Sequence, residues 1–522
     1  MAATSPAASN GGAEPLLTLL LSLTISLLAY ALVNRLVPAL GPDLVSKGLR
    51  GRDMLKRGFK RDEAGAGGEG DGDEPGRRWI PEATGVIAAS VYILLLSLFA
   101  PLPYLSHLLP SSFSAISLPE LNTTSFPPSS SSLSSPSANL IAPDDWAPSN
   151  GGAESLAFPH HSFATYLASL LSLLIATFLG FCDDVFDIRW RFKLPIPVIA
   201  SVPLLLTYAA GHGVTDVVLP NVFGIRELLG VAATNGVIHL GPLYYLYMSM
   251  LSTFCTNSIN ILAGVNGVEV SQSLLVALSL LLNDLLYLTL DLRPLLRLLP
   301  APLASALPTA LHEPWTAGFA HGSKELADRH LFSLYFMLPL VGVCAGLLRW
   351  NWYPSRAFVG DTFCYFSGMA FAVVGILGHF SKTLLLFFLP QIFNFLYSCP
   401  QLFGLVPCPR HRLPRLDEQT GRLENSWAPI KPKGQRSARE KVGVAILVVA
   451  EKARLVRLRR SAQSEVEATT NLTLLNLLLL WGGSVREDRL TMRVMALQCS
   501  GSAVAFGVRY GGAGWFYGVE RR

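Results

Sequence analysis

Long apolar stretches alternate with short polar segments along most of the chain. About 20 consecutive apolar residues are enough to cross a bilayer as a helix, so the pattern predicts about ten membrane spans. They are expected at 15–40, 83–110, 163–182, 195–212, 240–258, 265–290, 331–350, 361–378, 383–404 and 488–508. The first stretch is too long for a cleaved signal peptide and lacks its basic start. A very short turn separates the fifth from the sixth.

Composition agrees with this pattern. Hydrophobic residues make up 51% of the 522 residues and charged residues only 15%, whereas a soluble domain carries about 25% charged residues. The predicted fold class is therefore an all-α polytopic membrane protein, a bundle of about ten transmembrane helices. The seven cysteines have no spacing typical of a disulfide framework or a zinc site. All seven are expected to be buried and unreactive.

The distribution of Lys and Arg predicts the orientation of the bundle, because basic connections stay in the cytosol. The connections 41–79, 183–194 and 405–470 contain many Lys and Arg, whereas 111–162 contains none. Alternate connections are thus basic. We expect the basic face to be cytosolic and both termini to be lumenal.

Several segments lack the apolar content of a core. Residues 63–76 are rich in Gly and acids, 111–155 are rich in Ser and Pro, and 292–328 show little pattern. They are expected to be variable loops of a catalytic bundle over 1–404. Residues 405–470 are expected to form a cytosolic insert, and 471–522 the last span and a lumenal C-terminus. Of the two sequons, Asn122 is predicted to be glycosylated on the lumenal side and Asn471 to stay bare on the cytosolic side.

The first candidate chemistry is an acid pair at a membrane edge. Asp183 and Asp184 end an apolar stretch and are followed by Arg189, Arg191 and Lys193. Acids in such a place usually line a polar cavity or bind a cation, and the basic side chains suit phosphate. Together they predict phosphoryl transfer on a lipid.

Three further polar segments lie on the same predicted face. TNSINILAGVNGVE carries amides and an acid, which either bind a ligand beside a Gly-rich turn or join helices by hydrogen bonds. Asp361 follows Gly360 at the start of an apolar helix, either as an N-cap or as a further carboxylate for a divalent ion, for which Mg²⁺ fits best. PCPRHRLPRL is either a topogenic charge cluster or a shaped anion site, with Arg410, His411, Arg412 and Arg415 between prolines.

These segments resemble the polyprenyl-phosphate N-acetylhexosamine-1-phosphate transferase family. The matching words are GFCDDVFDIRWRFK, FCTNSINILAGVNGVE, NWYPSRAFVGDTFCYFSGMAFAVVGILGHFSKT, LPQIFNFLYS and PCPRHRLPRL. Bacterial relatives carry a His-rich motif where PCPRHR stands, so the chain is most similar to the eukaryotic branch. That resemblance implies transfer of N-acetylglucosamine 1-phosphate from UDP-N-acetylglucosamine to dolichyl phosphate, with release of UMP. It also implies Mg²⁺ dependence, a homodimer and the endoplasmic reticulum membrane.

The resemblance also implies roles for individual residues. Asn260 and Asp361 match the magnesium ligands, and Asp183, Asp184, Lys193 and Asp361 form the implied catalytic set. The implied dolichyl-phosphate site comprises Lys193, Thr253, Phe254, Cys255, Thr256, Asn257, Ser258, Ile259, Asn260 and Ile261. The implied nucleotide-sugar site comprises Arg52, Met54, Glu82, Asn266, Arg410, His411 and Arg412. The chain departs from the family at Leu55, where Asn is usual, and in the longer loop before Glu82.

In the implied mechanism, the acceptor phosphate is already a competent nucleophile, so the protein must mainly align it and neutralise charge. Whether Asp183 or Asp184 takes a proton or only positions cations is left open by the sequence. Two other classes are a transporter or lipid scramblase with a midplane ion site, and a non-catalytic family member. Against the first, the polar residues cluster at one face and no matched pair of interrupted helices occurs. Against the second, Asp183, Asp184, Asn260 and Asp361 are all present.

Overall fold

The computed structural model describes residues 13–52, 79–104, 159–193, 195–211, 213–219, 225–228, 236–297, 300, 308–409, 412–462 and 464–512. The predicted glycosylation site Asn122 and the candidate site residues Met54, Arg410 and His411 lie outside this part of the chain.

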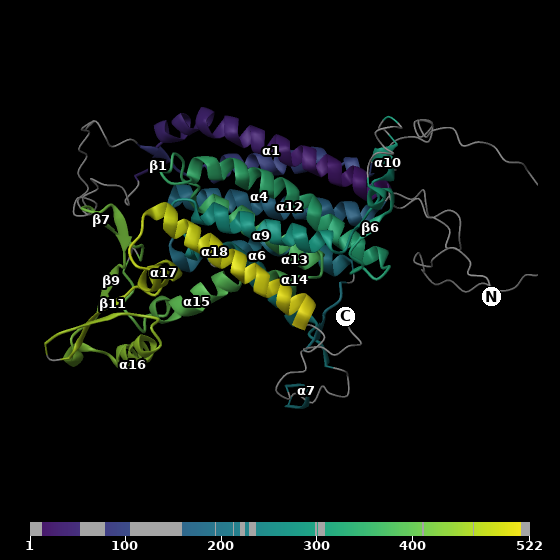
Figure 1. The fold of residues 1–522 in the computed structure, drawn as a ribbon. Coiled ribbons are helices and arrows are strands. Elements are labelled where there is room, and N and C mark those ends of the chain that lie inside the picture. Colours follow the sequence, from purple (N-terminus) through teal and green to yellow (C-terminus); the bar gives the residue numbers. More distant parts are fainter. Residues whose placement is uncertain are drawn as a thin grey trace, which may run out of the picture.

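Helices make up most of the described structure (Figure 1). The longer ones are α1 (Ala13–Ser46), α2 (Gly85–Phe99), α4 (His160–Phe186), α6 (Pro195–Ala210), α8 (Pro242–Ile261), α9 (Val268–Leu285), α12 (Lys324–Asn351), α13 (Gly360–Leu377), α14 (Ser381–Phe387), α15 (Leu389–Leu402), α16 (Ala438–Lys452), α17 (Leu474–Gly482) and α18 (Glu487–Phe506). Short helices are η3 (Leu102–Tyr104), α5 (Trp190–Lys193), α7 (Ile225–Leu228), α10 (Arg293–Leu296), η5 (Thr309–His312), η6 (Lys433–Gln435) and the π-helical turn η7 (Gly507–Gly512).

The bundle confirms a polytopic membrane protein. Within the described residues, α1, α4, α9, α12 and α13 are long and apolar enough to cross a membrane, and α14 with α15 adds a sixth candidate, bent by 72°. α2 and α6 are apolar but shorter. A helix occupies each of the ten predicted stretches, yet the count of ten spans is not confirmed, and the sides on which the termini lie stay a prediction.

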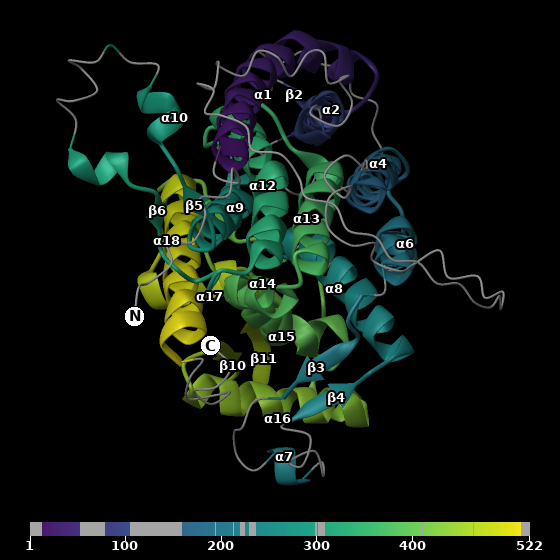
Figure 2. The same ribbon diagram turned by 90° about the vertical axis from the view of Figure 1, so that its right-hand side faces the viewer.

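α13 forms the centre of the bundle. Every residue from Thr362 to Ile376 is buried, and α13 contacts α4, α8, α2 and α12. Viewed along the bundle in Figure 2, α13 lies inside the ring of its neighbours. By contrast, the outer helices expose large apolar side chains, among them Leu98 (73%), Leu206 (65%) and Phe178 (63%). A surface of that kind is stable against lipid rather than water.

Strands occur in small antiparallel sheets at the bundle ends. Four are two-stranded: β1 (Arg50–Gly51) with β2 (Ile80–Pro81), β3 (Asp216–Val218) with β4 (Val237–His239), β5 (Thr289–Leu290) with β6 (Trp315–Thr316), and β7 (Arg415–Asp417) with β8 (Arg422–Glu424). The fifth has the order β10 (Leu458–Arg460), β11 (Val466–Thr470), β9 (Trp427–Pro429). This sheet, with the β7–β8 hairpin and α16, makes up the segment between α15 and α17.

The cysteine prediction is partly wrong. All seven are free, as expected, but Cys408 and Cys499 are exposed, whereas Cys182 and Cys399 are partly buried. Cys408 precedes Pro409 in a surface loop, and Cys499 lies on the outer face of α18, so neither has neighbours that would cover its sulfur.

Candidate active site

The acid pair lies where α4 ends. The helix runs to Phe186 and is closed by Asp187 in the left-handed conformation, with φ of 45°. The chain then turns back, and the Ile188 amide donates to Oδ1 of Asp183 at 3.1 Å. This turn carries the chain into α5, which ends at Lys193. The turn thus brings the basic side chain of Lys193 back toward the acid pair that precedes it in the sequence.

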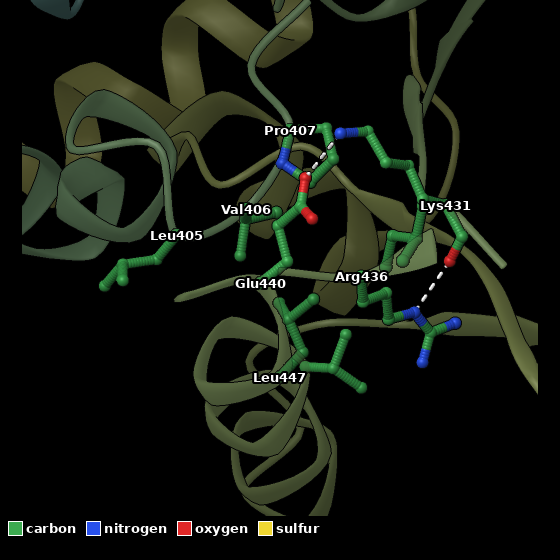
Figure 3. Close-up of a pocket in the computed structure, with 9 residues that line it drawn as sticks. Leu405, Val406, Pro407, Lys431, Arg436, Glu440 and Leu447 are labelled. Atoms are coloured by element: carbon green, nitrogen blue, oxygen red, sulfur yellow. Dashed lines mark hydrogen bonds and ion pairs between the residues drawn. The ribbon is translucent and has the colours of Figure 1, made fainter. Parts of the chain in front are cut away.

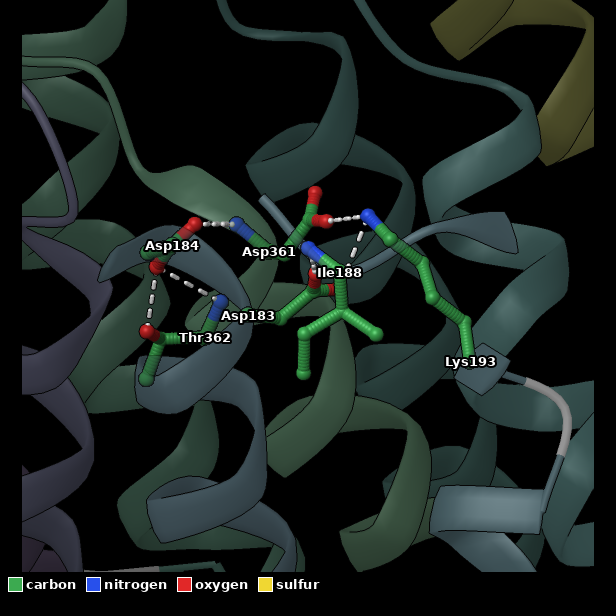
Figure 4. Close-up of polar contacts among 6 residues, drawn as sticks. All are labelled: Asp183, Asp184, Ile188, Lys193, Asp361 and Thr362. Atoms are coloured by element: carbon green, nitrogen blue, oxygen red, sulfur yellow. Dashed lines mark hydrogen bonds and ion pairs between the residues drawn. The ribbon is translucent and has the colours of Figure 1, made fainter. Parts of the chain in front are cut away.

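Lys193 joins two carboxylates that are far apart in sequence (Figure 4). Its Nζ lies 2.8 Å from Oδ2 of Asp183 and 2.7 Å from Oδ2 of Asp361. Burial by itself lowers the pKa of the Lys193 ammonium, but the charges of Asp361 and Asp183 outweigh it and raise the pKa above its ordinary value. Lys193 is therefore a fixed positive charge at neutral pH, placed between two carboxyl groups.

Asp184 has a different set of partners from Asp183. Its Oδ1 accepts from the Asp361 amide at 2.6 Å, and its Oδ2 accepts from the Thr362 amide at 3.0 Å and from the Thr362 hydroxyl. A carboxylate of α4 thus caps the N-terminus of α13, where free N–H groups and the helix dipole favour an anion. Gly360 permits this approach, because its φ is 70° and an added Cβ would lie 2.5 Å from Oδ2 of Asp184. Asp184 therefore holds Asp361 in place.

The α8–α9 turn brings the predicted amides to the same end of the bundle. Asn260 is half-buried in the last turn of α8, and α8 packs on α13 so closely that Gly368 has no room for a Cβ beside Thr256. Oε1 of Glu269 accepts from the Gly264 amide at 2.8 Å and fixes the turn. The backbone amide of Asn266 donates to Oε1 of Glu487 on α18, at 2.8 Å. Hydrogen bonds thus join this segment to α18, whereas ligand binding stays a prediction, for which Asn260 is accessible.

The predicted dolichyl-phosphate segment 253–261 has two faces. Cys255, Thr256, Ser258 and Ile259 are buried against neighbouring helices, whereas Thr253, Phe254, Asn257, Asn260 and Ile261 are partly exposed. The hydroxyl of Thr256 donates to backbone carbonyls of its own helix. Side-chain contact with a lipid substrate is thus limited to the second group in this conformation.

Arg412 is held by buried amides. Its carbonyl accepts from Nδ2 of Asn476 at 3.0 Å, and Oδ1 of Asn476 accepts from the Ser426 amide at 2.9 Å. Asn471 joins this network: its Nδ2 donates to Oγ of Ser426, and its Oδ1 accepts from Gln401. Asn471, the second sequon, is 1% exposed and so is structural. The backbone of the PCPRHR segment is thereby fixed where it meets α17.

The Arg412 side chain lines a cavity of about 180 Å³ together with Ile261, Leu262, Ala263, Leu413, Thr473 and Leu475. Its Nη1 is buried and has no hydrogen-bond partner among the described residues. Burial lowers the pKa of the Arg412 guanidinium. A guanidinium in this position is suited to an anion or a carbonyl entering the cavity.

Arg52 and Glu82, two candidate nucleotide-binding residues, follow the paired strands β1 and β2. The guanidinium of Arg52 lies 4.1 Å from the centroid of Trp79, and that of Arg50 lies 4.2 Å from it. Glu82 follows β2, and its amide donates to the Leu49 carbonyl at 3.1 Å. Burial, and next the charge of Asp361, raise the pKa of Glu82. Arg52 and Glu82 therefore lie beside one two-stranded sheet, with Glu82 within the electrostatic reach of Asp361.

The candidate magnesium ligands are of a suitable chemical type. No group of three or more His, Cys, Asp or Glu side chains in the described part of the chain could hold a metal. An amide oxygen from Asn260 and the 27% exposed carboxylate of Asp361 are hard ligands that leave room for water and substrate oxygens. Such a set fits Mg²⁺, which is usually held by one or two carboxylates plus phosphates.

Two residues that hold site residues in place were not predicted from the sequence. Thr362 binds Asp184, and Asn476 holds the Arg412 carbonyl. The sequence did indicate a structural role for Asn476, since an amide in the apolar run LLNLLLLW must find a hydrogen-bond partner when it is buried. The indication for Thr362 was weaker, because a hydroxyl side chain at the start of a helix is common.

Comparisons with known proteins agree with this geometry. A family model described as "Glycosyl transferase family 4" matches residues 166–379. The UDP-N-acetylglucosamine–dolichyl-phosphate N-acetylglucosaminephosphotransferase of Schizosaccharomyces pombe is 40% identical, over 94% of this chain and 90% of its own. Proteins of that name from Saccharomyces cerevisiae and Dictyostelium discoideum are 37% and 42% identical, over 92% and 66% of this chain and 88% and 68% of their own. Asp183, Asp184, Lys193, Asn260 and Asp361 all fall within the matched family segment.

Proposed function

The chain belongs to the family of UDP-N-acetylglucosamine–dolichyl-phosphate N-acetylglucosaminephosphotransferases, and we infer from this that it catalyses the transfer these names describe. N-acetylglucosamine 1-phosphate passes from UDP-N-acetylglucosamine to dolichyl phosphate, giving N-acetylglucosaminyl-diphosphodolichol and UMP. This is the first step in making the lipid-linked oligosaccharide for protein N-glycosylation. In the structure, the observation that supports this inference is the Lys193 contact with Asp183 and Asp361 at the polar end of a membrane bundle.

The acceptor side of the reaction is assigned to Lys193. An oxygen of the lipid phosphate attacks the β-phosphorus of UDP-N-acetylglucosamine, the phosphorus attached to the sugar, and the bond from that phosphorus to the oxygen bridging to UMP breaks. Lys193 carries a positive charge whose present partners are carboxylates, so an arriving phosphate dianion can share it. Asp183, whose side chain is fully buried, orients the ammonium. No strong base is needed for a phosphate nucleophile.

The donor side is assigned to Asp361, Asn260 and Arg412. Asp361 and Asn260 would hold Mg²⁺, which supplies charge neutralisation for the diphosphate when bound. Arg412 lines the cavity with Leu262 and Leu475 and has a buried Nη1 without a partner among the described residues, which suits the sugar and its diphosphate. Arg410 and His411 extend the same loop in sequence. Arg52, Met54, Glu82 and Asn266 are proposed to contact the nucleotide.

The Lys- and Arg-rich connections near this site support a cytosolic active site, and both termini are proposed to lie in the lumen of the endoplasmic reticulum. A homodimer is proposed from the family resemblance.

Purified protein in detergent, incubated with UDP-N-acetylglucosamine and dolichyl phosphate, tests the function. We expect UMP and the lipid-linked sugar in equal amounts, and neither product from Asp361→Asn. A transporter or scramblase would release no UMP, and a non-catalytic member would bind the substrates without turnover. Omitting Mg²⁺ or adding EDTA tests the metal in the same assay.

A further inference from the structure

α16 lies beside the active-site end of the bundle but is not one of the candidate spans. It is foreshortened in Figure 1 and runs across the view in Figure 2, so its axis is roughly perpendicular to the spanning helices. A helix placed in this way beside a membrane bundle runs along the plane of the membrane.

The inner face of α16 packs on the insert. Gly443 and Leu447 are the buried residues of the helix, and Gly443 has no room for a Cβ because the Leu405 carbonyl lies there. Leu447 belongs to a buried cluster with Val406 and Ile430. Figure 3 shows Leu447 and Glu440 of α16 beside Val406 and Pro407. The core of the insert therefore occupies this one face.

A second apolar face of α16 is uncovered. Val442, Ile446 and Val449 are 55%, 39% and 67% exposed. Their spacing of four and three residues places them on one side of the helix. Exposing three β-branched apolar residues to water is unfavourable, at about 25 cal/mol per Å² of apolar surface. One apolar face of α16 packs on the insert, so the second apolar face indicates a further apolar environment outside the insert.

The charges of α16 are sorted by face. Both acids are engaged with the insert: Glu440 completes a capping box with Ser437 and pairs with Lys431 at 2.9 Å, and Glu451 accepts from the Leu458 amide and pairs with Arg460. The exposed bases Arg439, Lys441 and Lys452 remain. At about 100° per residue, the two lysines border one side of the apolar stripe and Arg439 the other. The uncovered face is therefore apolar with a basic border.

α16 lies next to an apolar surface of a candidate membrane span. α15, part of the bent candidate span, exposes Leu396 (62%) and, at its C-terminal end, Phe403 (67%). Two residues after Phe403, the Leu405 carbonyl touches α16 at Gly443. The C-terminal end of α15 and α16 are therefore neighbours.

We propose that α16 docks on the bilayer surface at the active-site side, with Val442, Ile446 and Val449 among the upper acyl chains and its basic border at anionic lipid phosphates. An apolar helix face with Lys and Arg at its margins is typical of interfacial helices. The docking holds the insert, and with it the segment that leads through Val406 to Arg412, at a fixed height above the membrane. It does not depend on which reaction the site catalyses.

Nitroxide accessibility in lipid nanodiscs tests this proposal. The full-length chain, with Cys408 and Cys499 replaced by Ser, carries Ile446→Cys, or Glu418→Cys on the exposed turn of the β7–β8 hairpin as the matched control. The parent without a new cysteine gives the background. In discs of phosphatidylcholine and phosphatidylserine in equal parts, we expect the ratio of oxygen to nickel-chelate accessibility to be several-fold higher at 446 than at 418.

Two results would overturn the proposal. Equal ratios at 446 and 418 would show that the stripe faces water. Low accessibility of 446 to both oxygen and nickel chelate would show that a protein surface, such as a second copy of the chain, covers it.

The basic border is tested with Lys441→Gln and Lys452→Gln together in the 446-labelled protein. We expect the ratio to fall in the anionic discs and to stay unchanged in discs of pure phosphatidylcholine. An unchanged ratio in anionic discs, or an equal fall in both, would remove anionic lipid from the proposal. UMP release by each variant verifies that the catalytic site is folded.

Discussion

Asp184→Asn tests whether Asp184 works through Asp361 or binds a ligand itself. The carboxylate accepts three hydrogen bonds at the start of α13, two from amides and one from the Thr362 hydroxyl. Asparagine keeps one acceptor oxygen and turns an NH₂ group toward the other donors. Hydrogen bonds to a charged group contribute about 1.5–3 kcal/mol each, so losing one or two of them costs roughly 1.5–6 kcal/mol of stability. The displaced Asp361 should lower kcat.

Thermal unfolding in EDTA separates the two roles. If Asp184 is the cap of α13, Asp184→Asn lowers the melting temperature without any metal present, and Thr362→Val, which removes only the hydroxyl, has a smaller effect in the same direction. If Asp184 were instead a magnesium ligand, the loss would appear only when Mg²⁺ is added. A variant as stable as wild type in EDTA, with full kcat, would refute the capping role altogether.

Asp361→Ala is expected to abolish UMP release while the detergent-solubilised protein keeps its size-exclusion profile, since one ligand of the proposed metal is lost; activity retained there, or in wild type with EDTA, contradicts the metal assignment. Arg412→Lys should weaken UDP-N-acetylglucosamine binding roughly tenfold to a hundredfold, because about 1.5–3 kcal/mol of charge-assisted hydrogen bonding is lost, and should leave dolichyl phosphate binding nearly unchanged. Lys193→Ala should weaken dolichyl phosphate binding and leave UDP-N-acetylglucosamine binding nearly unchanged. Separate titrations of each variant with each substrate test both expectations. Asn476→Ala should raise KM for UDP-N-acetylglucosamine more than it lowers kcat, because it frees the Arg412 carbonyl; an unchanged KM in a folded variant counts against this positioning. Burial and the charge of Asp361 raise the pKa of Glu82, so its ionised carboxylate lowers the stability of the fold at neutral pH, and this loss vanishes as the pH falls below the ordinary pKa of a glutamate. Glu82→Gln should therefore raise the melting temperature at neutral pH but not in acid. A melting temperature raised only in acid would contradict the raised pKa of Glu82.

Hydrophobic length predicted where helices lie, but not how they break. The stretch 383–404 has the length of one span, yet α14 ends at Phe387 and α15 restarts at Leu389. Pro390 in the first turn of α15 has no N–H to continue the earlier hydrogen-bond ladder. In the insert, local signals were stronger: Ser437 and Glu440 have the spacing of a capping box, and the structure contains one. Contacts between the insert and α17 depend on tertiary packing, which no local pattern encodes.

The residue types of the site could be predicted from sequence, but their pairing could not. Asp184 and Thr362 are 178 residues apart, and their contact exists only because α4 packs on α13, where Gly180 lies against Thr362 and Tyr365. Similarly, Asn471 could be recognised as a sequon, whereas its burial against Ser426 and Gln401 depends on α15 and β11 meeting. Met54, Arg410 and His411 lie outside the described residues, so their assignments stay predictions.

The acid pair shows why adjacent residues of one type need not share a role. Successive side chains on a helix point about 100° apart, so Asp183 and Asp184 at the end of α4 must face different neighbours. Asp183 faces the returning chain and binds the Ile188 amide and the Lys193 ammonium. Asp184 faces α13 and accepts hydrogen bonds from the Asp361 amide and from the amide and hydroxyl of Thr362, in the first turn of α13. One acid therefore controls a cation and the other controls the position of Asp361, and both act on the point where Lys193 and Asp361 meet. Every carboxylate oxygen of the pair faces a donor or a cation in this arrangement.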